Sequence, residues 1–132
     1  MKVFDITAAQ FEPRFGHEKA VVFDEADFGA PAKVQVIRIA PGESIKPHHH
    51  AIRTEAFVIV SGEGEIKIGG ATAATSTTTS ATPPTVQLVL CKPGEVHEFT
   101  NTSRTEPLVV LVFRTNDNGN EDMIWEDQTN EQ

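Results

Sequence analysis

The sequence predicts a single all-β domain, either a sandwich or a closed barrel. Short stretches rich in Val, Ile and Phe recur along the chain, and clusters of Gly, Pro, Asn and Ser separate them. No comparable stretch has the apolar period of a long helix. A length of 132 residues suits one domain with one core. Six to eight short strands can enclose one small cavity.

The expected elements follow in chain order. The segment 18–28 is ambiguous between a strand and a helical turn. Six later stretches carry the strand pattern: 32–40, 55–60, 65–68, 86–90, 97–100 and 108–113.

Between two of these strands lies the threonine-rich stretch "GGATAATSTTTSATPPT", residues 69–85. It has almost no large apolar side chains to bury, so we expect a low-complexity loop over 70–85. Threonine also favours strands, and an exposed ribbon in part of the stretch stays open.

The charge of the chain is concentrated at its end. The formal net charge is -8, and residues 116–132 form an acidic tail without Lys or Arg. Its six acidic residues leave about -2 on the rest of the chain. Such a protein repels polyphosphates, which argues against a nucleic-acid partner. We expect a solvated tail, in which Met123, Ile124 and Trp125 offer an apolar anchor as the alternative.

Compartment signals are sparse. No apolar run approaches the roughly 20 residues of a membrane span, and the first 15 residues lack the apolar core of a signal peptide. The chain has one cysteine, which excludes an internal disulfide. We therefore expect a cytoplasmic protein with no membrane partner.

The stretch "PGESIKPHHHAIRTE", residues 41–55, carries the main functional signal. Alternate side chains of a strand share a face, so His48 and His50 point one way and His49 points the other. The first two lie about 7 Å apart along a strand and can converge on one ion.

A glutamate follows five residues later. We expect residues 51–54 to form a hairpin link, after which Glu55 opens the next strand with Phe57 and Ile59 on the same inward face. Two histidines and a carboxylate make a site for a divalent transition metal.

A fourth ligand has to come from another strand. His17 lies in a charged stretch without a matching partner. His97 starts a strand directly after a Pro-Gly turn, with Phe99 and Asn101 on the same face. His97 is therefore the better candidate.

These residues carry a resemblance. Gly42, His48, His50, Glu55 and Gly62 match the first motif of the cupins at every spacing.

The stretch "PGEVHEFTN", residues 93–101, looks like the second cupin motif, which ends in a histidine and an asparagine. It departs from the family in that Pro93 and Gly94 are adjacent, where one residue usually stands between them. This difference changes the turn and leaves the ligands in place.

The resemblance implies a double-stranded β-helix, the jelly-roll or cupin barrel, in a single domain over residues 1–132. In cupins the positions matching His48, His50, Glu55 and His97 bind one metal ion, here Fe, Mn, Ni or Zn. Cupins also commonly form homodimers. The apolar face of Ala56, Val58 and Val60 needs a cover, which a second copy or the chain's own second sheet can supply.

Such a site suits chemistry on anions. Three neutral imidazoles and one carboxylate leave a divalent ion with a local charge of about +1. An octahedral ion keeps about two positions for water, dioxygen or substrate. We expect it to attract a small anion and polarise its oxygens. The expected pocket-lining residues are Phe57, Ile59, Phe99 and Asn101.

Three other residues are expected to be structural. Alternation leaves open an Arg38 that points into the barrel and pairs with a substrate carboxylate, but the apolar face of Ile37 and Ile39 favours a surface position for it. Arg53 is expected to be solvated in the hairpin turn. Cys91 is expected to be a small packed side chain, because only Lys92 is placed to lower the pKa of its thiol.

Two classes of function remain. The first is a metal-dependent dioxygenase, isomerase or lyase acting on a small anionic, oxygenated molecule such as a keto acid or sugar acid. The second is a non-catalytic cupin module that binds a sugar or other small ligand. No residue beyond the ligands stands out as a catalytic acid or base.

Overall fold

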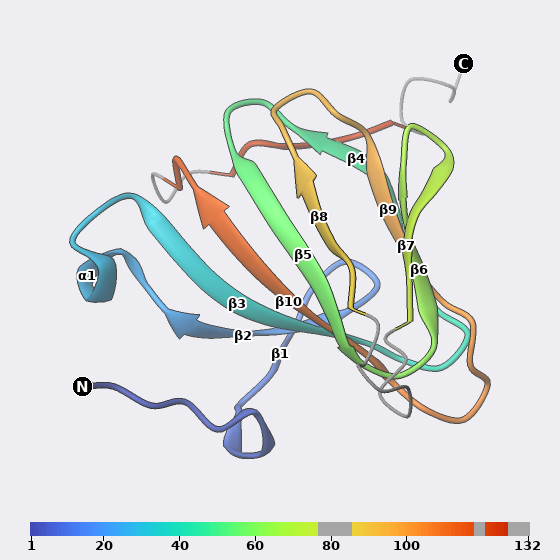
Figure 1. Ribbon diagram of the computed structural model, residues 1–132, viewed down its shortest axis with the longest axis horizontal. Helices are drawn as coiled ribbons and strands as arrows, with labels where there is room; N and C mark the ends of the chain where they lie inside the picture. The colour runs from blue at the N-terminus through green and yellow to red at the C-terminus, as the bar shows by residue number, and fades with distance from the viewer. Residues whose placement is uncertain (77–85, 118–120, 127–132) are drawn as a thin grey trace.

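The computed structural model describes residues 1–76, 86–117 and 121–126. Strands make up most of this part of the chain (Figure 1). The elements are η1 (Ile6–Ala8), β1 (Glu12–Pro13), β2 (Glu18–Phe23), α1 (Glu25–Phe28), β3 (Ala32–Ile39), β4 (Ser44–His50), β5 (Thr54–Ser61), β6 (Gly64–Ile68), β7 (Ala71–Thr75), β8 (Leu88–Cys91), β9 (His97–Asn101), β10 (Leu108–Thr115) and β11 (Met123–Trp125).

The strands form two antiparallel sheets that face each other (Figure 1). The six-stranded sheet has the order β1-β2-β3-β10-β5-β8, and the five-stranded sheet has the order β11-β4-β9-β6-β7. Six of the nine neighbouring pairs in these sheets join strands that are not consecutive in the sequence. This is the arrangement of a jelly-roll barrel, as the sequence predicted.

Period-two alternation explains which side chains fill the barrel. Along β5, Glu55, Phe57 and Ile59 are at most 3% exposed and point inward, while the residues between them face out. The opposite sheet contributes Ile45 and Phe99 to the same core. Alternation thus brings side chains from both sheets into one interior.

The connection between β4 and β5 differs from the expected hairpin. The two strands lie in different sheets and do not pair with each other. Instead β4 pairs with β9 and β11, while β5 pairs with β10 and β8. Residues 51–53 therefore cross from one sheet to the other, which places Glu55 across the interior from the histidines of β4.

The ambiguous segment 18–28 contains both expected structures, the strand β2 and the one-turn helix α1. A capping box starts the helix, in which the side chains of Asp24 and Asp27 each accept a backbone N–H of the other residue. Gly29, in the left-handed conformation, ends it.

The threonine-rich stretch is partly a strand. Residues 71–75 form β7 and pair with β6, so the ribbon alternative is right for this part. The remainder of the expected loop, residues 77–85, lies outside the described residues.

The acidic tail is built into the barrel over its described part. Strand β11 pairs with β4 in the register Met123↔His50 and Trp125↔His48. Asp117 has no exposed surface. The expectation of a solvated tail is wrong for these residues, because backbone pairing and ion pairs hold them. The end of the tail, residues 127–132, lies outside the described residues.

No helix in the described ranges has the length and apolar character needed to cross a bilayer.

Gly62 provides a test of the packing at one end of the barrel. Its φ is +91°, and a Cβ added there would lie 2.2 Å from the carbonyl oxygen of Pro107. Gly62→Ala should therefore lower the free energy of unfolding, measured with urea, by more than about 1 kcal/mol. Gly42→Ala is the matched control, because Gly42 has a similar φ of +74° but nothing within 4 Å of the added Cβ. Equal losses in the two variants would contradict this account.

Candidate metal centre

Three histidines from neighbouring strands meet inside the barrel. His48 and His50 come from β4, and His97 comes from β9, where it pairs with His48. All three are at most 4% exposed. One ring nitrogen from each lies within 4.8 Å of those from the other two. The structure thus brings together the three histidines that the sequence singled out.

The outer nitrogen of each ring is held by a hydrogen-bond acceptor. His48 Nδ1 donates to the carbonyl oxygen of Lys46 at 2.8 Å, and His97 Nδ1 donates to that of Glu95 at 3.1 Å. His50 Nδ1 donates to a carboxylate oxygen of Asp122 at 2.8 Å. Because these acceptors carry no hydrogen, Nδ1 of each ring donates, and Nε2 is the nitrogen left to bind a cation. This is the arrangement that metal-binding histidines have in proteins.

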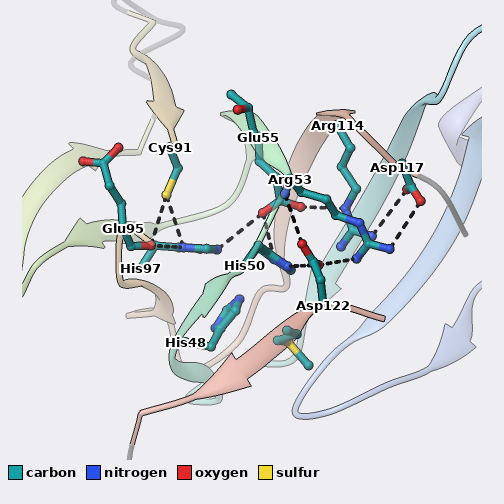
Figure 2. Close-up of polar contacts among 12 residues, drawn as sticks. His48, His50, Arg53, Glu55, Cys91, Glu95, His97, Arg114, Asp117 and Asp122 are labelled. Carbon is teal, nitrogen blue, oxygen red and sulfur yellow. Dashed lines mark hydrogen bonds and ion pairs between the residues drawn. The ribbon is translucent and has the colours of Figure 1, made fainter. Parts of the chain in front are cut away.

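Glu55 completes the cluster from the other sheet (Figure 2). Its Oε1 lies 3.1 Å from His50 Nε2 and 3.4 Å from His97 Nε2. Its Oε2 accepts a hydrogen bond from Arg114 Nε at 2.6 Å. Burial alone would raise the pKa of Glu55, but the neighbouring histidines and Arg114 hold that pKa well below its ordinary value. The side chain is therefore a carboxylate.

The distances of Glu55 Oε1 from His50 Nε2 and His97 Nε2 fit a shared divalent ion. Ligands about 2.1 Å from one metal lie about 3.0 Å apart in an octahedral site and about 3.4 Å apart in a tetrahedral one. The two distances from Glu55 Oε1 fall in this range. His97 Nε2 is buried without a hydrogen-bond partner among the described residues. A cation at this point would use that lone pair, whose burial is otherwise unfavourable.

The imidazole of His48 is neutral at physiological pH. Burial lowers its pKa to about 4, and the proximity of His97 and His50 adds to the effect. A metal therefore has no proton to displace from His48 near pH 7.

A cavity of about 40 Å³, measured as the space open to the centre of a water molecule, lies beside the cluster. That space holds about three water molecules. Phe57 and Phe99 line it, as expected. Further apolar lining comes from Ile37, Ile45, Val112 and Met123.

Two expected lining residues are not among those that line the cavity. Ile59 packs in the apolar core. Asn101 bonds to backbone instead: its amide donates to the carbonyl oxygens of Ile39 and Glu106, and its Oδ1 accepts from Ser103 N–H. Asn101 therefore links three backbone segments near the ends of these strands.

Two residues that line the cavity, Arg114 and His17, were not predicted from the sequence to lie there. Arg114 lies two residues beyond Val112 on β10 and shares its inward face, so extending the predicted strand past 113 would have revealed it. His17 lies in the turn before β2, with its Nδ1 donating to the carbonyl oxygen of Phe15 at 2.9 Å. Burial lowers the pKa of His17. No spacing signal in the sequence places it at the cavity.

Arg53 is 4% exposed, so the expectation of a solvated side chain is wrong. Its guanidinium lies 3.3 Å from Asp117, 3.3 Å from Glu121 and 3.0 Å from Asp122 (Figure 2). The expectation failed because all three carboxylates belong to the tail, more than 60 residues away in sequence.

Three side chains lie where the sequence analysis expected them. His49 points away from the cluster and contacts Glu126. Arg38 is on the surface, paired with Glu18 and stacked on Phe11. Cys91 is packed and 2% exposed, and burial raises its pKa to about 12. Its sulfur contacts His97 Nδ1 at 3.2 Å, a neighbour that the sequence did not indicate.

Comparisons with known proteins agree with the barrel. The model of the family described as the polysaccharide biosynthesis C-terminal domain matches residues 22–123. No curated protein matches the sequence. An uncharacterised Klebsiella pneumoniae protein with a double-stranded β-helix domain superposes with a TM-score of 0.69 at 20% identity, covering 95% of this chain and 96% of that one.

Two further solved structures are similar. A predicted oxalate decarboxylase from Thermotoga maritima has a TM-score of 0.68 at 20% identity, with 86% of this chain and 97% of that chain covered. The capsular polysaccharide assembling protein CapF from Staphylococcus aureus has a TM-score of 0.66 at 17% identity, with 89% of this chain but 31% of that chain covered. At these identities the likeness shows the fold, which is the double-stranded β-helix of the cupins.

The opposite orientations of His48 and His49 give a direct test of the centre. His48→Ala should weaken zinc binding, measured by competition with a chromophoric chelator, by more than about 100-fold, because it removes a buried lone pair. His49→Ala should leave zinc affinity nearly unchanged, because that ring points away. Equal losses in both variants would mean that the cluster is not where zinc binds.

Proposed function

Because the chain belongs to the family of polysaccharide biosynthesis C-terminal domains, and folds as a cupin, we propose that it is a metal-dependent enzyme acting on a small anionic, oxygenated substrate. The metal is one divalent ion of Fe, Mn, Ni or Zn, held by His48, His50, Glu55 and His97. The observation that supports the proposal is the convergence of three imidazoles beside a cavity, two of them next to a carboxylate oxygen of Glu55.

The residues around the centre would have different roles in binding the substrate. A bound divalent ion supplies Lewis-acid chemistry at a substrate oxygen. The Arg114 guanidinium, which lines the cavity, adds positive charge and favours an anionic group there. The apolar lining lowers the local dielectric constant and strengthens both interactions. The cavity suits the oxygenated end of a keto acid or sugar acid.

The comparisons support a sugar-related substrate within this class. The matched family and CapF both carry a description in polysaccharide biosynthesis. A sugar acid or keto sugar is therefore our first choice. The oxalate decarboxylase likeness supports a small carboxylic acid as the alternative within the same site. Isomerase, lyase and dioxygenase chemistry are all compatible with this donor set.

A non-catalytic ligand-binding module is the second candidate. The small number of acid–base groups at the cavity favours this candidate. Apart from the four metal-binding candidates, the titratable and cationic side chains lining its described part are His17 and Arg114. Binding of a sugar acid without turnover would follow from such a site.

Turnover separates the two candidates. Metal-loaded protein should convert at least one member of a panel of keto acids and sugar acids. Glu55→Gln should lower kcat/KM by at least about 100-fold, because it replaces a carboxylate ligand with an amide. Glu63→Gln, at an exposed position, is the matched control and should keep full activity. Tight metal and ligand binding without turnover across the panel would support the binding module instead.

We also propose that the domain, spanning 1–132, acts as a cytoplasmic homodimer. The support for a dimer is an outer patch on the six-stranded sheet, made of Val60, Leu88, Leu90 and Phe113. Leu88 is 74% exposed and Leu90 is 59% exposed, both on the edge strand β8. Covering such a face removes apolar surface from water. The free Cys91 is compatible with a reducing compartment.

The oligomeric state tests this face. The wild-type protein should elute with the mass of two chains in size exclusion with light scattering. Leu88→Glu should give one chain, because a carboxylate in the patch would be buried on pairing. Val3→Glu, at a position that is 80% exposed outside both sheets, should not change the mass. A monomeric wild type would overturn the dimer.

A further inference from the structure

Asp122 is held in one orientation by hydrogen-bond donors on both of its oxygens (Figure 2). Its Oδ1 accepts from His50 Nδ1 at 2.8 Å and lies 3.0 Å from Arg53 Nη1. Its Oδ2 accepts from the backbone N–H groups of Ile52 at 2.9 Å and of Arg53 at 3.0 Å. The side chain is only 8% exposed. With every contact supplied by a donor, the carboxylate cannot turn without losing hydrogen bonds.

This arrangement determines which nitrogen of His50 carries its proton. A carboxylate only accepts, so Nδ1 must donate to Asp122, and Nε2 is the nitrogen left for a cation. Nε2 faces Glu55 Oε1, 3.1 Å away, where a bound cation would take the place of a shared proton. Asp122 therefore sets both the orientation and the tautomer of His50.

The tail around Asp122 is docked on β4 at several points. The carbonyl oxygen of Asp122 accepts from Ala51 N–H at 3.1 Å, and Glu126 N–H donates to the carbonyl oxygen of Pro47 at 3.1 Å. The ring of Trp125 lies 5.3 Å from that of His48. The tail thus contacts the histidine strand over its second half, from Pro47 to His50.

Charged side chains link Asp122 to the glutamate of the cluster. Arg53 lies between Asp122 and Asp117, at 3.0 Å and 3.3 Å. Arg114 lies 3.9 Å from Asp117 and 2.6 Å from Glu55. Alternating charges therefore run from the carboxylate behind His50 to the carboxylate beside its Nε2 (Figure 2).

We propose that Asp122 is a positioning residue of the metal centre, through which the C-terminal segment fixes His50 for metal binding. The inference rests on the proposed metal centre, which it extends to a tail that the sequence indicated as solvated, with an apolar anchor as the alternative. Asp122 does not touch the ion. It acts through the proton on His50 Nδ1.

Asp122→Asn gives the sharpest test because it keeps the size and removes the charge. The two backbone N–H groups would keep the amide oxygen on their side, which turns the amide NH₂ toward His50 Nδ1. Two donors cannot pair, so His50 would move its proton to Nε2 and lose the lone pair that faces the centre. We expect zinc affinity to fall about 10-fold to 100-fold.

Glu126→Gln is the matched control. It makes the same change of charge on the same tail, against His49, which points away from the centre. Zinc affinity should stay within a factor of about 2, well below the effect expected for a residue behind a ligand. Fluorescence of Trp125, the one tryptophan of the chain, should be the same in wild type and Asp122→Asn, which shows that the tail remains docked.

A second measurement does not depend on the metal. The ¹⁵N shifts of His50 in the full wild-type chain before metal addition should show Nδ1 protonated, and those of Asp122→Asn should show a proton on Nε2 alone. A wild-type His50 protonated on Nε2 alone, or unchanged zinc affinity in Asp122→Asn, would overturn the inference. If the wild type bound no metal, the proposed function would fail, while the ¹⁵N shifts would still decide whether Asp122 sets the tautomer.

Discussion

The buried carboxylate of Glu55 is the constraint on which the rest of the structure depends. A carboxylate inside an apolar barrel is costly unless charge and hydrogen bonds compensate for its lost hydration. Here one oxygen is paired with Arg114 and the other faces two imidazoles. The need to satisfy both sides accounts for the positions of β10, which supplies the arginine, and of β4 and β9, which supply the rings. A cation between carboxylate and imidazoles would complete this compensation.

Arg114 brings a second requirement, which draws the tail into the site. A guanidinium that is mostly buried needs its own counter-charge, and Asp117, without exposed surface, lies close to it. Asp117 in turn lies beside Lys33 and Arg53. The acidic composition of the C-terminal segment, which in the sequence resembles a solvated terminus, is in part a set of partners for buried cations.

Local features of the sequence were enough to predict the all-β class and the faces of individual strands. The inward set of β5 and the opposite orientations of His48 and His49 follow from alternation within one strand, which needs no knowledge of the fold. The four ligand-type residues came from spacing and from the cupin motifs, and the structure groups ring nitrogens of the three histidines, with Glu55 Oε1 beside two of them. Arg114 was within reach of the same alternation, had the predicted strand been two residues longer.

The parts that could not be predicted depend on contacts between distant segments. The sequence of a short link such as residues 51–53 does not tell whether the strand that follows it pairs with the strand before it or joins the opposite sheet. Arg53 looks solvated until the tail is placed beside it. Asp122 and His17 have no motif, because their roles depend on where the tail and the N-terminal turn dock, and docking follows from the shape of the whole barrel.

The place of β11 at the end of its sheet has a consequence for the exposed backbone edge of β4. Strand β4 carries three histidines in a row, and β11 covers its outer backbone edge with a short stretch of pairing. A chain shortened before β11 would expose a row of free N–H and C=O groups on β4, and such open edges recruit strands from other molecules. The last strand thus also shields its neighbour from intermolecular β-sheet growth.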